Sequence, residues 1–335
     1  MRNPPLSLYV HIPWCVQKCP YCDFNSHGLK SALPEKEYVA HLLDDLAEDA
    51  KSIGDRQVDT VFIGGGTPSL FSADAMAEII AGIKARVNLV PDAEITMEAN
   101  PGTVEAGKFL GFYQAGVNRI SVGIQSFQPQ HLAVLGRIHN DDQAIHAVKQ
   151  AHSAGLPTFN LDLMHGLPQQ SVDNAMSDLD KGIALNPYHL SWYQLTIEPN
   201  TPFYSRPPEL PDDDILWEIQ ERGHRVLEAA GFKQYEISAY AKEGHQCRHN
   251  LNYWRFGDYL GVGCGAHGKI TDIESGTIKR LVKVKHPRGY MEMSRPYIDT
   301  TTVVEKNDIP FEFFMNRFRL LEPCPIDDYS ALTGV

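Results

Sequence analysis

"HIPWCVQKCPYCDFNSH" (residues 11–27) contains three of the chain's six cysteines within eight positions. Cys15, Cys19 and Cys22 have the spacing Cx3Cx2C and follow a β-rich run at residues 6–12. Thiolates held this closely in a short loop are typical ligands of iron–sulfur clusters. Three of them on a [4Fe–4S] cluster would leave one iron open to a ligand from outside the protein. The stretch therefore predicts a cluster with an open coordination position at the end of the first strand.

Zinc is the alternative metal for these cysteines. Structural zinc usually takes four ligands, often as two CxxC-like pairs. His11 and His27 are close enough in sequence to supply one ligand, but no second pair of cysteines exists. The spacing therefore favours the cluster over zinc.

Composition limits the class of protein. The chain has 335 residues, which suits one large α/β domain with an appendage or two domains. The net charge of −12 argues against nucleic acid or an anionic membrane surface as the main partner. No apolar run approaches the roughly 18–20 residues of a membrane span. Residues 1–10 do not read as a secretory signal, and the scattered remaining cysteines do not form a disulfide pattern, so a reducing cytosol is expected.

Short β-rich runs alternate with amphipathic segments over the first two-thirds of the chain. The expected strands are residues 6–12, 60–64, 94–98, 119–125, 158–163 and 189–195. The expected helices are residues 35–52, 74–86, 103–115, 141–154 and 171–185. This alternation indicates repeated βα units around a parallel sheet, either an incomplete β/α barrel or a doubly wound sheet.

Polar residues at the strand ends favour the barrel. Each expected strand is closed or followed by residues able to contact a ligand: the cysteine loop, Gly64–Thr67, Glu98, Gln125, Asp162, and Gln194 with Glu198. In β/α barrels the site is built at the carboxyl ends of the strands. Polar residues also mark strand ends without any function, but six consecutive units make that explanation weak.

The βα rhythm stops after the proline- and acid-rich segment 198–214. A helix is expected at 214–230, with Gly231 as its C-cap, and a late helical stretch at 310–322. We therefore divide the chain into residues 1–212 and a smaller, mainly helical domain at residues 213–335.

The string CVQKCPYC resembles the cluster motif of the radical S-adenosylmethionine (SAM) superfamily. The resemblance implies a partial (β/α)6 barrel in which Cys15, Cys19 and Cys22 hold a [4Fe–4S] cluster. In that superfamily the methionine part of SAM chelates the open iron, and electron transfer from the reduced cluster releases a 5′-deoxyadenosyl radical. The protein's task is to hold the cluster and the sulfonium together away from water.

Further strings narrow the resemblance. "YVHIPWC" (9–15), "FIGGGTPS" (62–69), "VGIQSF" (122–127), "LGRIH" (135–139) and "FNLDLMHGLP" (159–168) are similar to the branch that contains haem chaperones and oxygen-independent coproporphyrinogen III oxidases. This similarity runs over essentially the whole chain. It implies that SAM is bound by Tyr9, Tyr21, Gly65, Gly66, Thr67, Glu98, Gln125, Arg137 and Asp162.

The residue types fit those roles on physical grounds. A glycine run after a strand lets the backbone approach a ligand closely, although any tight βα turn also uses glycine. Glu98, in "MEANP" (97–101), is a carboxylate at a strand end and suits the ribose hydroxyls of SAM. Taken alone, it would equally fit a solvated strand end.

Three features separate the two members of the branch. The oxidase motif continues CxxxCxxCxC, and this chain has Phe24 at the position of the fourth cysteine. The oxidase also has a long extension before its first strand, which here begins near Leu6. "HNLNYW" (249–254) fits the HNxxYW motif of the haem-chaperone group, where it is tied to haem binding.

The resemblance therefore implies that His249, Tyr253 and Trp254 contribute to haem binding. Histidine is a common axial ligand of haem iron, and Tyr and Trp offer flat apolar surface to a porphyrin. On the residues alone, a histidine beside asparagine and aromatics is more often a packed structural residue. "GVGCGAHG" (261–268) offers Cys264 and His267 as rival ligands, and its glycines also fit simple tight turns.

We expect a cytosolic haem chaperone that delivers haem to respiratory proteins, without coproporphyrinogen oxidase activity and with no assigned catalytic residue. The alternative is the oxidase, which decarboxylates porphyrinogen propionates; a metal-free or zinc-binding barrel ranks third. A homodimer is a further expected partner, whereas nucleic acid and an integral membrane segment are not. The chain stops at "YSALTGV", where the family usually continues for some tens of residues in a helical module, so that module is expected to be missing.

Overall fold

A computed structural model describes residues 1–104, 107–292 and 294–335 of the chain. The six predicted strands of the βα units all form. Their bounds are β1 (Leu6–Ile12), β4 (Gln57–Gly65), β5 (Asn88–Ala99), β6 (Arg119–Gln125), β7 (Thr158–His165) and β8 (His189–Gln194). Most residues of β1, β6 and β7 are buried on both faces, which is why they read as continuous apolar runs.

Helices connect these strands as predicted. The predicted ones are α1 (Glu35–Ile53), α2 (Ala73–Arg86), α3 (Lys108–Ala115), α5 (Asp141–Ser153) and α6 (Val172–Ala184). Two short helices, α4 (Pro129–Val134) and α7 (Pro202–Ser205), were not predicted. Capping boxes begin α5 at Asn140 and α6 at Ser171. The helix expected at 103–115 begins later, at Lys108, and residues 105 and 106 of that range lie outside the described residues.

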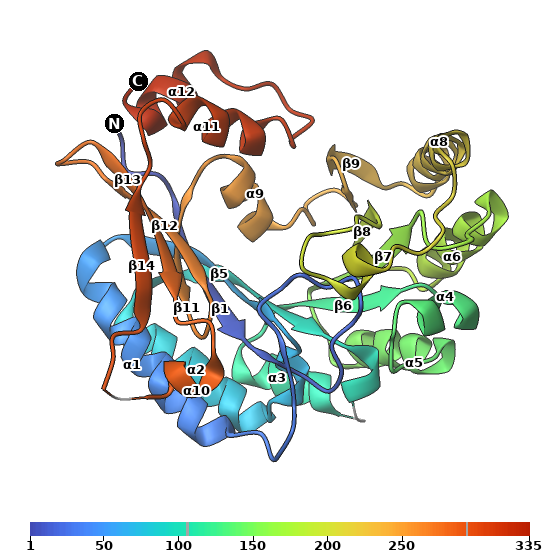
Figure 1. Ribbon diagram of the computed structural model, residues 1–335, viewed down its shortest axis with the longest axis horizontal. Helices are drawn as coiled ribbons and strands as arrows, with labels where there is room; N and C mark the ends of the chain where they lie inside the picture. Colours follow the sequence, from blue (N-terminus) through green and yellow to red (C-terminus); the bar gives the residue numbers. More distant parts are fainter. Residues whose placement is uncertain (105–106, 293) are drawn as a thin grey trace.

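The strands of the βα units belong to one open sheet. Among the described residues it has twelve strands in the order β14-β13-β12-β11-β1-β4-β5-β6-β7-β8-β10-β9. The strands from β11 to β8 run parallel, and the pairs at both margins are antiparallel. Because β14 and β9 are separate edges, the sheet curves without closing (Figure 1). The predicted α/β fold with a partial barrel is confirmed.

Residues after 212 complete this sheet at both ends. Their strands are β9 (Lys233–Glu236), β10 (Ala239–Ala241), β11 (Asp258–Val262), β12 (His267–Asp272), β13 (Thr277–Lys283) and β14 (Ile298–Val303). Their helices are α8 (Asp213–Ala229), α9 (Arg248–Trp254), α10 (Pro287–Tyr290), α11 (Ile309–Arg317) and α12 (Ile326–Thr333). This part, expected to be mainly helical, thus contributes strands as well as helices. The division at residue 212 stays a prediction.

Strand β11 gives the fold its most consequential long-range contact. It pairs in parallel with β1, with Leu6 opposite Asp258 and Val10 opposite Val262. Helix α9, which carries the HNLNYW motif, precedes β11 and packs against β1, β4 and β11. Figure 1 shows α9 on the side of the sheet opposite α1, α2 and α3. The two motifs of the sequence, more than two hundred residues apart, therefore adjoin the same pair of neighbouring strands: the cysteine loop follows the carboxyl end of β1, and α9 precedes the amino end of β11.

Capping at the helix ends follows the local sequence. The C-cap of α8 is Ala230 rather than the predicted Gly231, and Gly231 follows it with a φ of 83°, the left-handed conformation common just after a C-cap. Asp212 caps the start of α8 by accepting a hydrogen bond from the Ile215 amide at 2.9 Å. Within the described ranges of the chain, no helix is long and apolar enough to cross a membrane.

Candidate functional site

A short second sheet closes the base of the cysteine loop. β2 (Trp14–Cys15) pairs in parallel with β3 (His27–Gly28), with Trp14 opposite His27 and Cys15 opposite Gly28. The Cys22 amide donates to the Cys19 carbonyl at 3.2 Å, which folds the loop back between the two thiols. All three thiols are half-buried and line one cavity of about 230 Å³. The loop thus presents the three predicted cluster ligands to a common space.

The positions of these thiols suit a cluster better than a single ion. Within the part of the chain that the structure describes, no three His, Cys, Asp or Glu side chains are placed to hold one metal ion. In a [4Fe–4S] cluster each thiolate binds a different iron, so the sulfurs need not converge on one point. Arg137 Nη1 donates to the Cys19 Sγ at 3.7 Å, which holds that thiol beside the cavity. The residues present therefore fit the predicted cluster.

The predicted SAM residues gather in the same cavity, with one exception. Its lining includes Tyr21, Gly65, Gly66, Thr67, Glu98, Gln125, Arg137 and Asp162 together with the three cysteines. Tyr9 instead lines the adjoining larger cavity, where its hydroxyl lies 3.0 Å from His11 Nδ1. The exception follows from position: Tyr9 is mid-strand in β1, whereas most of the other residues lie at or beyond strand ends.

The glycine turn after β4 is hydrogen-bonded to the backbone that leads into the cysteine loop. The Gly66 amide donates to the Ile12 carbonyl at 2.7 Å, and the Thr67 amide donates to the Trp14 carbonyl at 2.8 Å. A Cβ atom on Gly66 would lie 2.5 Å from the Trp14 carbonyl oxygen, closer than any real Cβ contact. Glycine is therefore required here by the approach of two backbone segments, before any ligand is considered.

Two partly buried carboxyl groups line the cluster cavity. Glu98 Oε2 accepts a hydrogen bond from the Gly65 amide at 3.1 Å. Burial, reinforced by the negative charge of Asp162, raises the pKa of Glu98 to about 8. Burial also raises the pKa of Asp162, which accepts hydrogen bonds from Ser121 at 2.9 Å and Asn160 at 2.7 Å. Both groups are held in place and are able to accept or donate hydrogen bonds to a polar ligand.

Several lining residues were missed by the sequence predictions. Ser121 and Gly123 line the cavity beside Gln125, as expected for alternate residues of one strand, and that periodicity was the available signal. Tyr193 on β8 donates from its hydroxyl to Gln125 Oε1 at 2.7 Å. Gln125 itself has a φ of 69°, an unusual conformation for a residue other than glycine. The Tyr193 contact holds this side chain toward the cavity.

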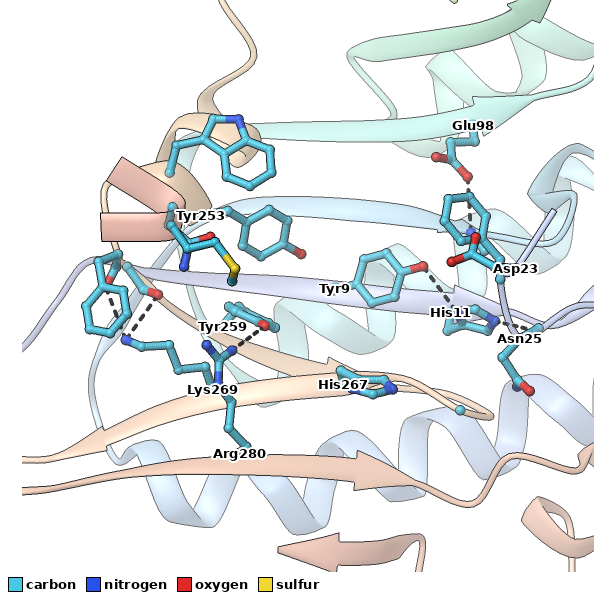
Figure 2. A pocket seen from close by; sticks show the side chains of 18 residues that line it. Tyr9, His11, Asp23, Asn25, Glu98, Tyr253, Tyr259, His267, Lys269 and Arg280 are labelled. Atoms are coloured by element: carbon cyan, nitrogen blue, oxygen red, sulfur yellow. Dashed lines mark hydrogen bonds between the residues drawn. The ribbon is translucent and has the colours of Figure 1, made fainter. Parts of the chain in front are cut away.

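A second, larger cavity of about 610 Å³ adjoins the first (Figure 2). The two share Phe24, Gly65 and Glu98 in their linings. Its walls are strongly aromatic, with Tyr9, Phe24, Tyr253, Trp254, Phe256 and Tyr259. Its volume lies in the range of about 300–1,000 Å³ typical of small-molecule and cofactor sites. Phe24 thus stands at the boundary between the cluster cavity and an aromatic cavity.

His249, the predicted haem-binding histidine, is fully buried outside the cavity lining. Its Nδ1 lies 2.8 Å from the Thr60 hydroxyl and its Nε2 lies 2.8 Å from the Tyr253 hydroxyl. Burial, followed by the charge of Arg119, lowers its pKa to about 3, so the ring is neutral. Both ring nitrogens are therefore committed to hydrogen bonds within the protein.

The other predicted haem residues do face the aromatic cavity. Tyr253 and Trp254 line it, with Tyr253 in edge contact with Tyr259 at a ring-centroid distance of 4.6 Å. Of the rival ligands, His267 is exposed and lines the cavity, whereas Cys264 is fully buried beneath it. Burial raises the pKa of Cys264 to about 12, which keeps it a thiol.

Comparison with known proteins places the chain among radical SAM proteins. A profile of the Radical SAM superfamily matches residues 9–179. The chain is 62% identical to the "Heme chaperone HemW" of Escherichia coli K12, over all of this chain and 88% of that protein. It is 58% identical to the "Heme chaperone HemW" of Haemophilus influenzae, with the same coverage of both chains.

A solved structure with the same fold is that of coproporphyrinogen III oxidase (HemN) from Escherichia coli, described as a radical SAM enzyme. The TM-score is 0.84, over 99% of this chain and 80% of the oxidase, at 20% sequence identity. At that identity the likeness establishes the fold and carries no argument about activity.

Proposed function

Because the chain belongs to the radical SAM superfamily and, within it, to the HemW family, we propose that it is a haem chaperone: it binds haem and delivers it to haem-requiring proteins. The observation that carries the proposal is the 62% identity that extends over all of this chain. The oxidase, by contrast, is matched in fold at 20% identity. Oxygen-independent coproporphyrinogen III oxidase therefore remains the less favoured function.

Membership of the superfamily implies a [4Fe–4S] cluster and SAM as cofactors. Cys15, Cys19 and Cys22 would hold the cluster in the 230 Å³ cavity. Bound together, the cluster and SAM supply one-electron chemistry at the sulfonium of SAM. Two properties of the residues support this assignment: the three thiols line one space, and Arg137 donates to one of them.

The remaining lining residues have roles that follow from their chemistry. Glu98 and Asp162 offer carboxyl oxygens to the hydroxyl and amino groups of SAM, while Gly65, Gly66 and Thr67 form the turn beside it. Tyr193 fixes Gln125, and Tyr21 covers the cavity next to Phe203, with their ring centroids 6.4 Å apart. These contacts hold the polar groups in position and exclude water from the cavity.

The aromatic cavity distinguishes a carrier from an enzyme in this proposal. A carrier needs apolar surface for a flat ligand and an exit to a recipient, and the aromatic walls provide the first. The proposed recipients are haem-requiring respiratory proteins, reached from the cytosol. Delivery as a homodimer belongs to the same proposal.

Haem transfer is the direct test. Anaerobically reconstituted protein loaded with ferric haem should pass it to the apo form of a haem-requiring respiratory protein, detected by the recipient's absorbance spectrum. The same preparation, given coproporphyrinogen III, SAM and reductant, should form no protoporphyrinogen. Clear protoporphyrinogen formation would replace the chaperone with the oxidase.

Cluster binding is tested separately from haem binding. Reconstituted wild type should contain about four irons and four sulfides per chain, as a [4Fe–4S] cluster requires. Cys19→Ala should lose them, whereas Cys324→Ala, at a half-buried cysteine outside both cavities, should retain them. Equal iron contents in the two variants would remove the assignment.

A further inference from the structure

The haem ligand can be sought among the histidines around the aromatic cavity. His249 lies outside the lining and has both ring nitrogens in hydrogen bonds, to Thr60 and Tyr253. Bringing iron to its Nε2 would require breaking the Tyr253 contact and opening a fully buried site. A buried donor or acceptor left without a partner costs about 1–3 kcal/mol. His249 is thus poorly placed to bind iron.

His11 lines the cavity but is equally committed. Its Nδ1 lies 3.0 Å from the Tyr9 hydroxyl and its Nε2 lies 2.8 Å from the Asn25 carbonyl oxygen. The ring is also nearly fully buried. It therefore fixes the Tyr9 phenol and the cysteine loop, and has no nitrogen to offer a ligand.

His267 differs from both. It begins strand β12, lines the cavity and is exposed, and no hydrogen bond joins its ring to any described residue. Figure 2 shows it in the same cavity as Tyr9, Tyr253 and Tyr259. Its imidazole is thus free to bind a metal centre that enters from solvent.

Resting on the proposed haem-carrying function, we propose that the aromatic cavity is the haem site and that His267, rather than His249, supplies the axial ligand to the iron. The HNLNYW motif then shapes the wall of the site instead of ligating: His249 orients the Tyr253 phenol, and Tyr253 and Trp254 provide the aromatic surface. In this proposal the motif contributes to haem binding because His249 positions Tyr253, and not because His249 binds the iron.

Trp254 adds a second observation that points to a ligand. Its indole Nε1 is buried and has no hydrogen-bond partner among the described residues. The ring is held on one side by the guanidinium of Arg319, 4.2 Å from its centroid. A buried donor without a partner is unusual in native proteins, and an acceptor group on a bound ligand would satisfy it.

The two cationic side chains that line the cavity, Lys269 and Arg280, are held in contacts within the protein. Lys269 Nζ is paired with Asp258 at 2.9 Å and also donates to the Phe256 carbonyl at 3.1 Å. Arg280 donates to the Tyr259 hydroxyl at 2.9 Å and is paired with Glu312. Neither side chain is available as a ligand, and Arg280 instead orients the Tyr259 ring at the cavity wall.

Cys264 is the other rival ligand that the sequence offers. It is fully buried, and its thiol donates to the Lys285 carbonyl oxygen at 3.2 Å. It does not line the cavity. A thiolate ligand would therefore need both deprotonation of a buried thiol and a rearranged loop.

Titration of the 335-residue chain with ferric haem, followed by absorbance, tests the proposal. Wild type should bind with the spectrum of a histidine ligand. Loss of a group that only supports a metal ligand already weakens binding by roughly tenfold. His267→Ala should therefore weaken haem binding by at least that factor, and it should shift the Soret band. Added imidazole should restore the wild-type spectrum in His267→Ala by filling the vacated position.

Matched variants separate ligation from folding. His286→Ala removes an exposed histidine outside the aromatic cavity and should leave the titration unchanged. His249→Ala should alter the free energy of unfolding but, where folded, keep a histidine-ligated spectrum. Unchanged spectrum and affinity in His267→Ala, or loss of the histidine spectrum in folded His249→Ala alone, would overturn the inference. Failure of the wild type to bind haem would instead overturn the proposed function itself.

Discussion

Lys283 and Asp45 form a fully buried ion pair that ties strand β13 to helix α1, with 2.5 Å between Nζ and Oδ1. Asp49 adds a second carboxylate to Lys283 at 2.8 Å. Asp45 Oδ2 also accepts hydrogen bonds from the Tyr290 hydroxyl at 2.7 Å and the Gly263 amide at 3.0 Å. One carboxylate thus anchors the loop that leads to Cys264 and His267.

Removing the cation of this cluster should destabilise the protein strongly. Lys283→Met leaves Asp45 and Asp49 buried without a counter-charge, and breaking a buried pair in this way costs about 3–5 kcal/mol. Urea denaturation measures the loss. Lys279→Met, on the same strand, breaks a half-exposed pair with Asp272 and should cost at most about 1 kcal/mol. Similar losses for the two variants would contradict the assignment.

A methyl group at Gly66 should displace the cysteine loop. Gly66→Ala places a Cβ against the Trp14 carbonyl, and overpacking of this kind costs about 1–3 kcal/mol. We expect lower stability and a lower iron content after anaerobic reconstitution. Gly28→Ala is the matched control, because Gly28 lies at the end of the cysteine loop and its Cβ would have no atom within 4 Å. A Gly66→Ala variant with full iron content would show that the loop tolerates the shift.

His249 should contribute mainly to stability. His249→Ala removes one hydrogen-bond partner from each of the Thr60 and Tyr253 hydroxyls and opens a cavity, with an expected loss of about 3 kcal/mol. Tyr253→Phe removes one of the two hydrogen bonds and should cost about 1 kcal/mol. The double variant should lose less than the sum of the two, because they share a contact. Strict additivity would argue that the pair does not interact.

Glu98 should make stability depend on pH. Its pKa is about 8 in the folded protein against an ordinary value of 4.5, because burial and Asp162 disfavour the charge. The folded state therefore binds this proton more tightly than the unfolded state. The contribution is fully present below pH 4.5 and is lost as pH rises through 8.

The matching variant is Glu98→Gln, which is neutral at every pH. Relative to wild type it should gain stability between pH 6 and pH 9 in ligand-free protein, measured by urea denaturation at each pH. Parallel curves for the two proteins over this range would mean that Glu98 is already ionised at pH 6.

Much of the fold was predictable because it depends on local pattern. β1 and β6 have the predicted bounds, and α1 extends one residue beyond its predicted end, since continuous apolar runs and helical periodicity are properties of neighbouring residues. The candidate cluster site was likewise predictable, because its three cysteines lie in one short loop. The joining of β11 to β1 was not predictable, because it pairs residues about 250 positions apart.

The difference between local pattern and long-range contact also explains which features of the site were predictable. The polar strand ends converge because parallel strands end at one edge, so their gathering in one cavity followed from the alternation of elements. The burial of His249 depends on Thr60, 189 positions away, and no local signal reports such a partner. Phe24 was noted as a missing cysteine, yet its place at the boundary of two cavities became visible with the structure.

The central position of β1 also sets an order of events during synthesis. β1 leaves the ribosome first, but β11, the neighbour on one of its edges, ends at Val262. Until that segment has been translated, one edge of β1 is unpaired and the wall opposite β4 is absent. The strand that leads into the cysteine loop therefore stays open along that edge until Val262 has been translated, although the residues that line the cluster cavity are complete by Tyr193.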